Sequence, residues 1–193
     1  FLLDDFSKYV VHRTLHAVPL LWSFHKVHHT AETLTPFTVY RTHPVEGVIF
    51  ALRASVTQGL AIAVFIFFFG DKADLLTVLG ASVFLFAFNA TGSNLRHSHV
   101  WISYGLTLER FLISPAQHQI HHSTASQHRD RNFGAVLAIW DRIFGTFYLP
   151  VEDGIPVQPD RLGHPSGYKD EGNYFKLFFL WRYMPKFMRP KEG

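Results

Sequence analysis

Closely spaced histidines are the feature of this chain that most restricts its fold. Thirteen residues are histidines, and eight of them form one H-x-x-x-H box and two H-x-x-H-H boxes. The boxes are His12/His16, His25/His28/His29 and His118/His121/His122. Because residues i, i+3 and i+4 share one helix face, we expect each box to direct its imidazoles at a single point. Eight converging rings exceed the needs of one mononuclear site, so the spacing predicts a dinuclear metal site on helices.

The composition favours a membrane-embedded protein and excludes cysteine chemistry. Of the 193 residues, 48% are hydrophobic and 16% aromatic, with Phe occurring 20 times, an aromatic content typical of membrane proteins. Cysteine is absent, which excludes disulfides, Fe–S clusters, thiolate-bound haem and a cysteine nucleophile. Any metal ion must therefore be bound through nitrogen and oxygen atoms. A net charge of only +3 without a base-reading motif argues against nucleic-acid binding.

A long apolar stretch predicts a helical hairpin across a membrane. Pro44 is well suited to the first position of a helix, and residues 48–69 are almost entirely apolar. Their number matches the roughly 20 residues that span a bilayer. A break at residues 70–72 precedes a second apolar stretch at 75–90, so we expect a transmembrane hairpin at about 45–92. A buried hairpin in a soluble helical protein is the alternative, but apolarity on all faces argues against it.

The hairpin would return the chain to the side that it left. His97 and the residues after it would then rejoin the first two boxes, and a helical cap would hold the dimetal site. Basic residues gather on that side, whereas only Lys72 marks the other. These basic residues are Arg13, Lys26, Arg41, Arg96, Arg110, Arg129 and Arg131. The bias places the cap and its metal site on the cytoplasmic side. The fold class is therefore an all-α integral membrane protein.

The remaining segments give weaker signals. Helices are expected over residues 1–18 and 20–30, with a polar connection at 30–42. Ser114-Pro115-Ala116-Gln117 predicts a helix start with a capping box, and residues 134–144 are a further helix candidate. Residues 150–172 are expected to form a surface loop, and 173–184 an amphipathic segment at the membrane surface. We expect one domain over 1–193, and the helical sequence at Phe1 suggests that upstream residues are missing.

Several motifs occur together in a characteristic order. They are Asp5-x-x-x-Tyr9-x-x-His12-Arg13-x-x-His16, His25-Lys26-Val27-His28-His29, His43-Pro44-Val45-Glu46, Asn94-x-x-His97-Ser98, His118-Gln119-Ile120-His121-His122, and Asn132-Phe133-Gly134 followed by Trp140-Asp141-Arg142-Ile143-Phe144-Gly145-Thr146. This set resembles the fatty acid hydroxylase/sterol desaturase superfamily of membrane-bound di-iron oxidoreductases, in particular its bacterial-type members. The resemblance covers residues 5–147.

The resemblance implies a set of metal ligands and a reaction. Carried onto this sequence, the ligands of two iron ions are His12, His16, His25, His28, His29, His97, His118, His121 and His122. Zinc is expected as a substitute in purified samples. The implied reaction uses O₂ to hydroxylate or desaturate a C–H bond of a lipid such as a fatty acyl chain or sterol. Ether-lipid cleavage is an alternative within the superfamily. An external electron donor of the cytochrome b5 or ferredoxin type is also implied.

Other polar residues are candidates for supporting roles. Some relatives have a histidine pair at the His97 position, but Ser93 stands four residues earlier here, so Asn94 or His99 is a further candidate. His43 is either a tenth ligand or pocket-lining group, or a helix-start histidine bonded to Glu46. Ligating histidines usually donate their second N–H to an acceptor, and the candidates are Asp5, Glu46 and Asp141. His128 and His164 lie in polar stretches and are expected to be solvated.

Aromatic residues near the boxes are candidates for the lining of a substrate channel. They are Phe24, Phe37, Phe50 and Trp101. For each of them an ordinary role in the hydrophobic core is the alternative.

Three other classes of protein also use histidines as ligands. A divalent-metal transporter should carry histidines at mid-span, yet residues 48–90 contain none. A zinc hydrolase usually needs three protein ligands and a general base, and no H-E-x-x-H is present. A bis-histidine haem protein would pair single histidines rather than triplets. None of these classes explains the repeated triplets.

Overall fold

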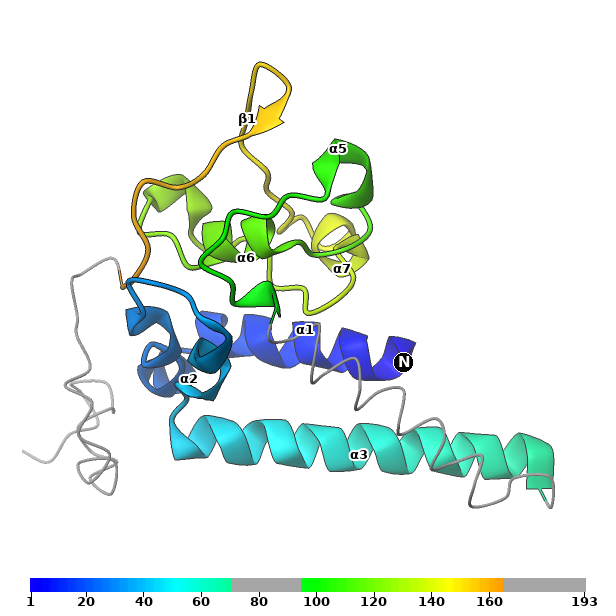
Figure 1. Ribbon diagram of the computed structural model, residues 1–193. Helices are drawn as coiled ribbons and strands as arrows, with labels where there is room; N and C mark the ends of the chain where they lie inside the picture. Colours follow the sequence, from blue (N-terminus) through cyan, green and yellow to red (C-terminus); the bar gives the residue numbers. More distant parts are fainter. Residues whose placement is uncertain (71–94, 165–193) are drawn as a thin grey trace, which may run out of the picture.

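The computed structural model describes residues 1–70 and 95–164 (Figure 1). The described part is mainly helical, with 3-10 turns (η) and one small antiparallel hairpin. Its elements are α1 (Leu2–Ala17), α2 (Pro19–His25), η1 (His28–Thr30), η2 (Pro36–Tyr40), α3 (Pro44–Phe69), α5 (Gly105–Leu108), α6 (Pro115–His121), η4 (Ser126–His128), α7 (Ile139–Ile143), β1 (Val151–Glu152) and β2 (Ile155–Pro156).

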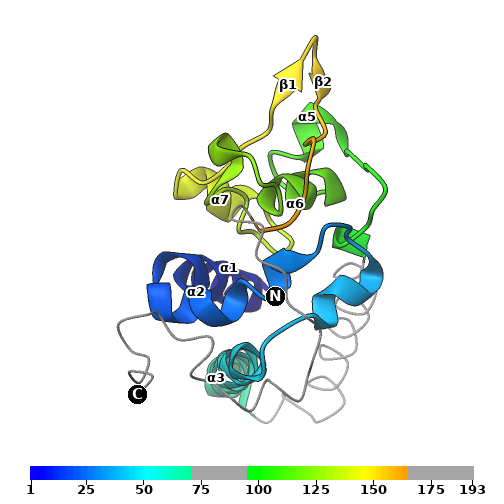
Figure 2. The ribbon, with the colours of Figure 1, turned by 90° about the vertical axis from the view of Figure 1, so that its left-hand side faces the viewer.

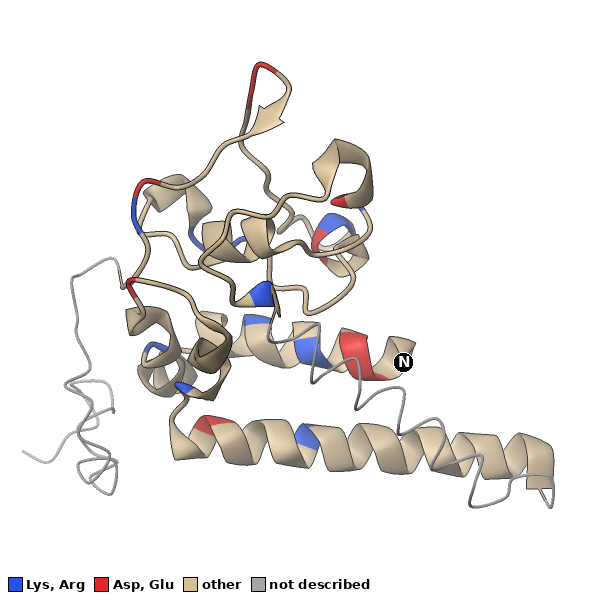
Figure 3. Cartoon of the chain, viewed as in Figure 1, with Lys and Arg blue, Asp and Glu red and all other residues tan. Residues whose placement is uncertain are grey.

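The longest helix, α3, is suited to a membrane by its length and composition. Its 26 residues extend over about 39 Å at 1.5 Å per residue, more than the roughly 30 Å of a bilayer core. Large apolar side chains stand exposed along it, including Phe67 at 82% and Phe68 at 72%. Beyond Arg53 the helix carries no charged residue (Figure 3). Contact with lipid would remove this apolar surface from water.

Helix α1 packs between α3 and the part of the molecule that contains α5, α6 and α7 (Figures 1 and 2). Towards α3, Arg53 donates to the Asp4 carboxylate at 2.7 Å and to the Ser7 hydroxyl at 2.7 Å. Towards α7, the ring of Phe6 lies 4.9 Å from that of Trp140. Because α1 contacts both layers, its histidines lie between the apolar helix and the segments that follow residue 95.

A buried carboxylate joins α1 to the segment before α7. Asp5 is 1% exposed and accepts from the backbone N–H of Val136 and Leu137 and from the indole N–H of Trp140, at 3.0, 3.1 and 2.8 Å. These bonds satisfy both carboxylate oxygens over a sequence separation of more than 130 residues. They therefore fix α1 against the segment that leads into α7.

Within residues 1–70 and 95–164 the predicted helices are present, but two have different limits. Helix α2 ends at His25, and the chain continues through a turn into η1, so the helix predicted over 20–30 is too long. The helix predicted over 134–144 is limited to α7, because the preceding residues donate backbone bonds to Asp5 and Asp141 instead. The capping box at Ser114 is confirmed, with Ser114 and Gln117 bonding reciprocally.

Some predictions lie outside the described residues. These are the returning apolar helix at 75–90, the amphipathic segment at 173–184 and the position of Asn94. Within the predicted loop at 150–172, the described portion contains the β1–β2 hairpin, which pairs Val151 with Pro156 and Glu152 with Ile155.

Candidate metal centre

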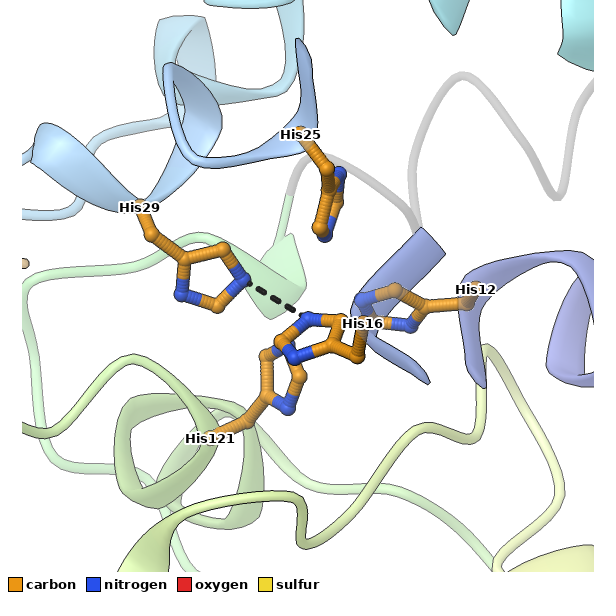
Figure 4. A group of neighbouring side chains, drawn as sticks. All are labelled: His12, His16, His25, His29 and His121. Atoms are coloured by element: carbon orange, nitrogen blue, oxygen red, sulfur yellow. Dashed lines mark hydrogen bonds between the residues drawn. The ribbon is translucent and has the colours of Figure 1, made fainter. Parts of the chain in front are cut away.

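The nine histidines gather into two neighbouring groups. The five-histidine cluster contains His12, His16, His25, His29 and His121 (Figure 4). The four-histidine cluster contains His28, His97, His118 and His122. Within each cluster, one ring nitrogen from every member lies within 4.8 Å of all the others. The clusters adjoin one another, since the rings of His29 and His122 stack with centroids 4.4 Å apart.

Each H-x-x-H-H box divides between the two clusters. In both boxes the first and last histidines go to one cluster and the middle one goes to the other: His25 and His29 separate from His28, and His118 and His122 from His121. The expectation that each box directs its rings at one point is therefore wrong for both H-x-x-H-H boxes, whereas it is confirmed for His12 and His16, which share the five-histidine cluster. The second box is not continuous helix, because α2 ends at His25 and His28 begins a 3-10 turn. In the third box, His118 and His122 are four residues apart and lie on the same helix face, whereas His121 points in a different direction around the helix axis.

The Nε2 atoms of the four-histidine cluster crowd together. His97 Nε2 lies 3.2 Å from His28 Nε2 and 2.9 Å from His118 Nε2. His118 Nε2 also lies 3.1 Å from His122 Nε2. A neutral imidazole has one N–H, so one ring nitrogen cannot donate to two such neighbours. Converging lone pairs of this kind are the arrangement that a metal cation stabilises.

The five-histidine cluster shows the same convergence. The Nε2 atoms of His16 and His29 lie 3.1 Å apart. The Nε2 atoms of His25 and His121 are buried and have no hydrogen-bond partner within residues 1–70 and 95–164. Buried nitrogen atoms without partners are costly, and coordination to a metal ion would satisfy them. The donor set of both clusters therefore fits metal ions that accept imidazole ligands.

Burial keeps these histidines in the neutral form that binds metals. It lowers the pKa of His25, His28 and His121 to about 3. Burial, followed by repulsion between neighbouring imidazoles, also lowers the pKa of His12 and His16 well below 6.5. The same causes lower the pKa of His29, His118 and His122. Protons therefore compete only weakly with a cation near pH 7.

The outer ring nitrogens of the five-histidine cluster have defined acceptors. His12 Nδ1 donates to the Phe133 carbonyl at 2.9 Å, and His121 Nδ1 donates to the Arg131 carbonyl at 2.7 Å. His25 Nδ1 donates to Glu46 Oε1 at 3.0 Å. Each of these bonds places the proton on Nδ1 and leaves Nε2 with a lone pair directed into the cluster, as is usual for metal-binding histidines.

Only one of the three candidate carboxylate acceptors contacts a histidine ring. Glu46 does so, through His25. Both oxygens of Asp5 accept from α7 and the residues before it, as described above. Asp141 accepts from the backbone N–H of Phe133 and Gly134, both at 2.8 Å, and from the Thr146 hydroxyl at 2.6 Å. Asp141 thus acts on His12 indirectly, by holding the peptide whose carbonyl accepts from the ring.

The other candidate histidines lie outside both clusters. His43 is buried at the start of α3, where its Nδ1 accepts from the Val45 N–H at 3.1 Å, so it contacts the helix backbone, while Glu46 is bonded to His25. His99 is exposed. His128 is 6% exposed and packs on Tyr148, and His164 is half-buried against Trp22. The expectation that His128 is solvated is therefore wrong, whereas His164 is only partly shielded from solvent by Trp22.

A cavity of about 300 Å³ reaches both clusters from the side of α3. His12 and His25 of one cluster and His28, His97 and His118 of the other line it. The remainder of the lining is mixed: Phe50, Phe133 and Val39 are apolar, Lys8 and Arg96 are basic, and Glu46 is acidic. A second cavity of about 470 Å³ reaches the five-histidine cluster beside Trp22 and His164.

The most important contacts that sequence reasoning missed are backbone carbonyls. Those of Arg131 and Phe133 accept from two clustered histidines, and a carbonyl is present at every position, so no residue type marks them. Trp22, whose ring lies 4.8 Å from that of His16, was also missed. Its position three residues before the second box is the only sequence signal for it.

Comparisons with known proteins show which family and which relatives this chain is similar to. The family profile described as fatty acid hydroxylase matches residues 1–146. Alkylglycerol monooxygenase of Danio rerio is 33% identical over 169 residues, which cover 86% of this chain and 33% of the relative. Ornithine lipid hydroxylase OlsE of Rhizobium tropici is 25% identical, covering 77% and 40%. Delta(7)-sterol 5(6)-desaturase ERG3A of Gibberella zeae is 30% identical, covering 77% and 36%.

The chain spans about a third of the length of the first of these curated relatives. No solved structure matches the chain.

Proposed function

Because the chain belongs to the fatty acid hydroxylase family, we propose that it is a membrane-bound oxidoreductase that uses O₂ to hydroxylate or desaturate a C–H bond of a lipid. The observation that carries this proposal is the pair of buried histidine clusters on the lining of one cavity beside an apolar helix. Two metal ions bound by these clusters would lie next to a space that a lipid could enter.

The two clusters are the positions for two iron ions. His12, His16, His25, His29 and His121 would hold one ion, and His28, His97, His118 and His122 the other. Imidazole nitrogen suits iron, although zinc binds the same ligands. When bound, a pair of irons supplies the redox chemistry with O₂ that an unactivated C–H bond requires and that side chains cannot provide.

The protein itself binds and orients the substrate. Phe50 and Gly47 of α3 line the cavity together with Phe133, so an acyl chain entering along α3 would meet apolar contacts close to the histidines. Lys8 and Arg96 add positive charge to the same lining. This mixed lining suits a lipid whose polar end stays near the metal centre.

The proposed membrane topology is a hairpin whose first half is α3. Residues 75–90 would form the returning half of a hairpin with α3, and the histidine side would face the cytoplasm. Two features support this orientation: the charges of α3 are confined to its first part, and the basic residues of the described part lie before the apolar portion of α3 or after residue 95.

The reaction also needs electrons from outside the chain. The absence of cysteine from the sequence leaves no ligand for an Fe–S cluster, and no flavin or haem motif is present. An external donor of the cytochrome b5 or ferredoxin type would supply two electrons per turnover.

A second candidate within the same chemistry is the oxidation of ether lipids. The alkylglycerol monooxygenases of Danio rerio and Homo sapiens are 33% and 34% identical to this chain. Hydroxylation of the carbon next to an ether oxygen gives a hemiacetal, which breaks down to an aldehyde and an alcohol. A divalent-metal transporter is less well supported, because the histidine clusters lie outside α3.

The test is transfer of labelled oxygen to a lipid. Full-length protein loaded with iron under anaerobic conditions would be supplied with ¹⁸O₂, a reductant and membrane lipids, including an alkylglycerol. We expect a lipid product with one added ¹⁸O atom, or an unsaturated product, and an aldehyde if ether lipids are the substrate. A variant lacking both His28 and His121 should form none. Protein that holds two irons yet oxidises no lipid would contradict the proposal.

A further inference from the structure

The two clusters differ in how their outer nitrogens are held. In the five-histidine cluster, Nδ1 of His12, His25 and His121 donates to a protein acceptor, and His16 Nδ1 lies 3.5 Å from an Asp130 carboxylate oxygen. In the four-histidine cluster, Nδ1 of His28, His118 and His122 has no hydrogen-bond partner in the part of the chain that the structure describes. The rings of the first cluster are therefore oriented by more contacts.

Three of these contacts come from one short segment, residues 130–133. It supplies the Asp130 carboxylate to His16, the Arg131 carbonyl to His121 and the Phe133 carbonyl to His12. His12 and His16 lie on α1, whereas His121 lies on α6. A single segment thus sets the orientation of rings from two helices that are distant in the sequence.

Asn132 fixes the conformation of this segment. It is fully buried and has a φ of 55°, a left-handed conformation that Asn tolerates better than most residues. Its amide donates to the carbonyls of Gln117 and Tyr148 at 3.2 and 2.8 Å and accepts from the Tyr148 N–H at 2.9 Å. The bond to Gln117 attaches the segment to α6, next to the third box.

Asp141 supports the other end of the segment through the N–H groups of Phe133 and Gly134. Gly134 leaves no room for a side chain there, because an added Cβ would lie 2.7 Å from the Leu137 carbonyl oxygen and 2.8 Å from Asp141. Both ends of the segment are therefore fixed before any ligand binds.

We propose that residues 130–133, held by Asn132, position the five-histidine cluster and make it the tighter of two unequal metal sites. This inference rests on the proposed function, in that both clusters bind metal. Rings oriented in advance lose less freedom on coordination, and loss of such outer contacts typically weakens metal binding 10- to 100-fold. The four-histidine cluster has four rather than five ligand nitrogens, and in the described part of the chain fewer of its rings are held through Nδ1, so it holds the more readily exchanged ion.

The test is a zinc titration of the metal-free, full-length protein against a competing chelator. Wild-type protein should bind two ions in two separate steps. His121 and His122 are adjacent but belong to different clusters, which makes their alanine variants matched controls. His121→Ala should remove the tighter step and His122→Ala the weaker one. The reverse assignment would overturn the proposal.

Asn132→Gly is the decisive variant, because glycine keeps the positive φ while removing the three amide bonds. We expect the tighter step to weaken 10- to 100-fold and the weaker step to change less than about twofold. Thr38→Ala, which removes another buried side-chain hydrogen bond, controls for lost stability and should change neither step. Equal weakening of both steps by Asn132→Gly would show a merely structural role and overturn the proposal.

Asp130→Asn provides a second variant that does not threaten folding, because the Asp130 side chain is 62% exposed. It should weaken the tighter step alone, by less than Asn132→Gly. An unchanged tighter step in both variants would overturn the inference while leaving the proposed function intact. Failure of wild-type protein to bind two ions would instead contradict the proposed function itself.

Discussion

At the scale of single residues, neighbours in the sequence have different partners in space. His121 completes the five-histidine cluster, and His122 belongs to the four-histidine cluster. Both are buried and neutral, and each directs its Nε2 atom at the rings of its own cluster. The adjacent pair at the end of each H-x-x-H-H box thus serves both clusters, which explains why the two clusters lie side by side.

The spacing of the boxes, with the family resemblance for His97, predicted all nine histidines that the structure brings together, but not their division. A pattern of residues i, i+3 and i+4 fixes only directions around an unbroken helix. The division depends on where α2 ends and on tertiary contacts such as the Phe133 carbonyl. Glu46 was identified from its motif, whereas the carbonyl acceptors had no sequence signal.

The depressed histidine pKa values predict acid sensitivity of the metal-free protein. His25, His28 and His121 have a pKa of about 3 in the folded state and about 6.5 when unfolded. Between these values the unfolded chain binds more protons, so the free energy of unfolding should fall as the pH drops from 6.5. Each histidine contributes up to about 1.4 kcal/mol per pH unit.

This acid sensitivity is measured by circular dichroism and proton uptake in detergent. His28→Asn should lower the proton uptake on unfolding at pH 4.5 by about one. A free energy of unfolding that stays constant between pH 6.5 and 4 would contradict the neutral assignment.

At the scale of elements, α1 organises the molecule. It carries His12 and His16 of the five-histidine cluster and contacts both α3 and the segment before α7. Its position was not predictable from its own sequence, because the helical period shows which face is buried but not against what. The capping box of α6 was predictable, since capping depends on residues next to one another. The end of α2 was not, because no Gly or Pro marks it.

Asp5 is expected to stabilise this arrangement without acting on the metals. Asp5→Ala would leave three buried N–H donors without an acceptor, at a cost of about 3 kcal/mol or more. We expect a lower thermal unfolding midpoint, measured by tryptophan fluorescence, with two metal ions still bound at low temperature. Loss of one specific ion at unchanged stability would instead indicate a direct role at a cluster.

At the scale of the whole molecule, charge and apolar surface separate along α3. Its distal part is uncharged and exposed, whereas charged residues are spread over α1 and the segments that follow residue 95 (Figure 3). The apolar sequence predicted this helix well, because spanning a membrane needs only length and continuous apolarity. The returning helix stays a prediction, since residues 75–90 lie outside the described part.

The hairpin predicts which residues share one side of the membrane. Because the chain has no cysteine, a single introduced cysteine would be the only thiol that a maleimide can label. Its labelling would show on which side of the membrane that residue lies. Glu152→Cys and His99→Cys should react with an impermeant maleimide from the cytoplasmic side, and Lys72→Cys only from the other side. Labelling of all three from one side would contradict the hairpin.

The most direct test of the account is the number of iron ions per chain in protein prepared without oxygen. We predict about two ions in the wild-type protein. Because His28 and His121 belong to different clusters, the variant lacking both should lose affinity at both sites and retain almost no iron after dialysis. A single ion in the wild-type protein, or two ions retained by the double variant, would contradict a dinuclear histidine centre.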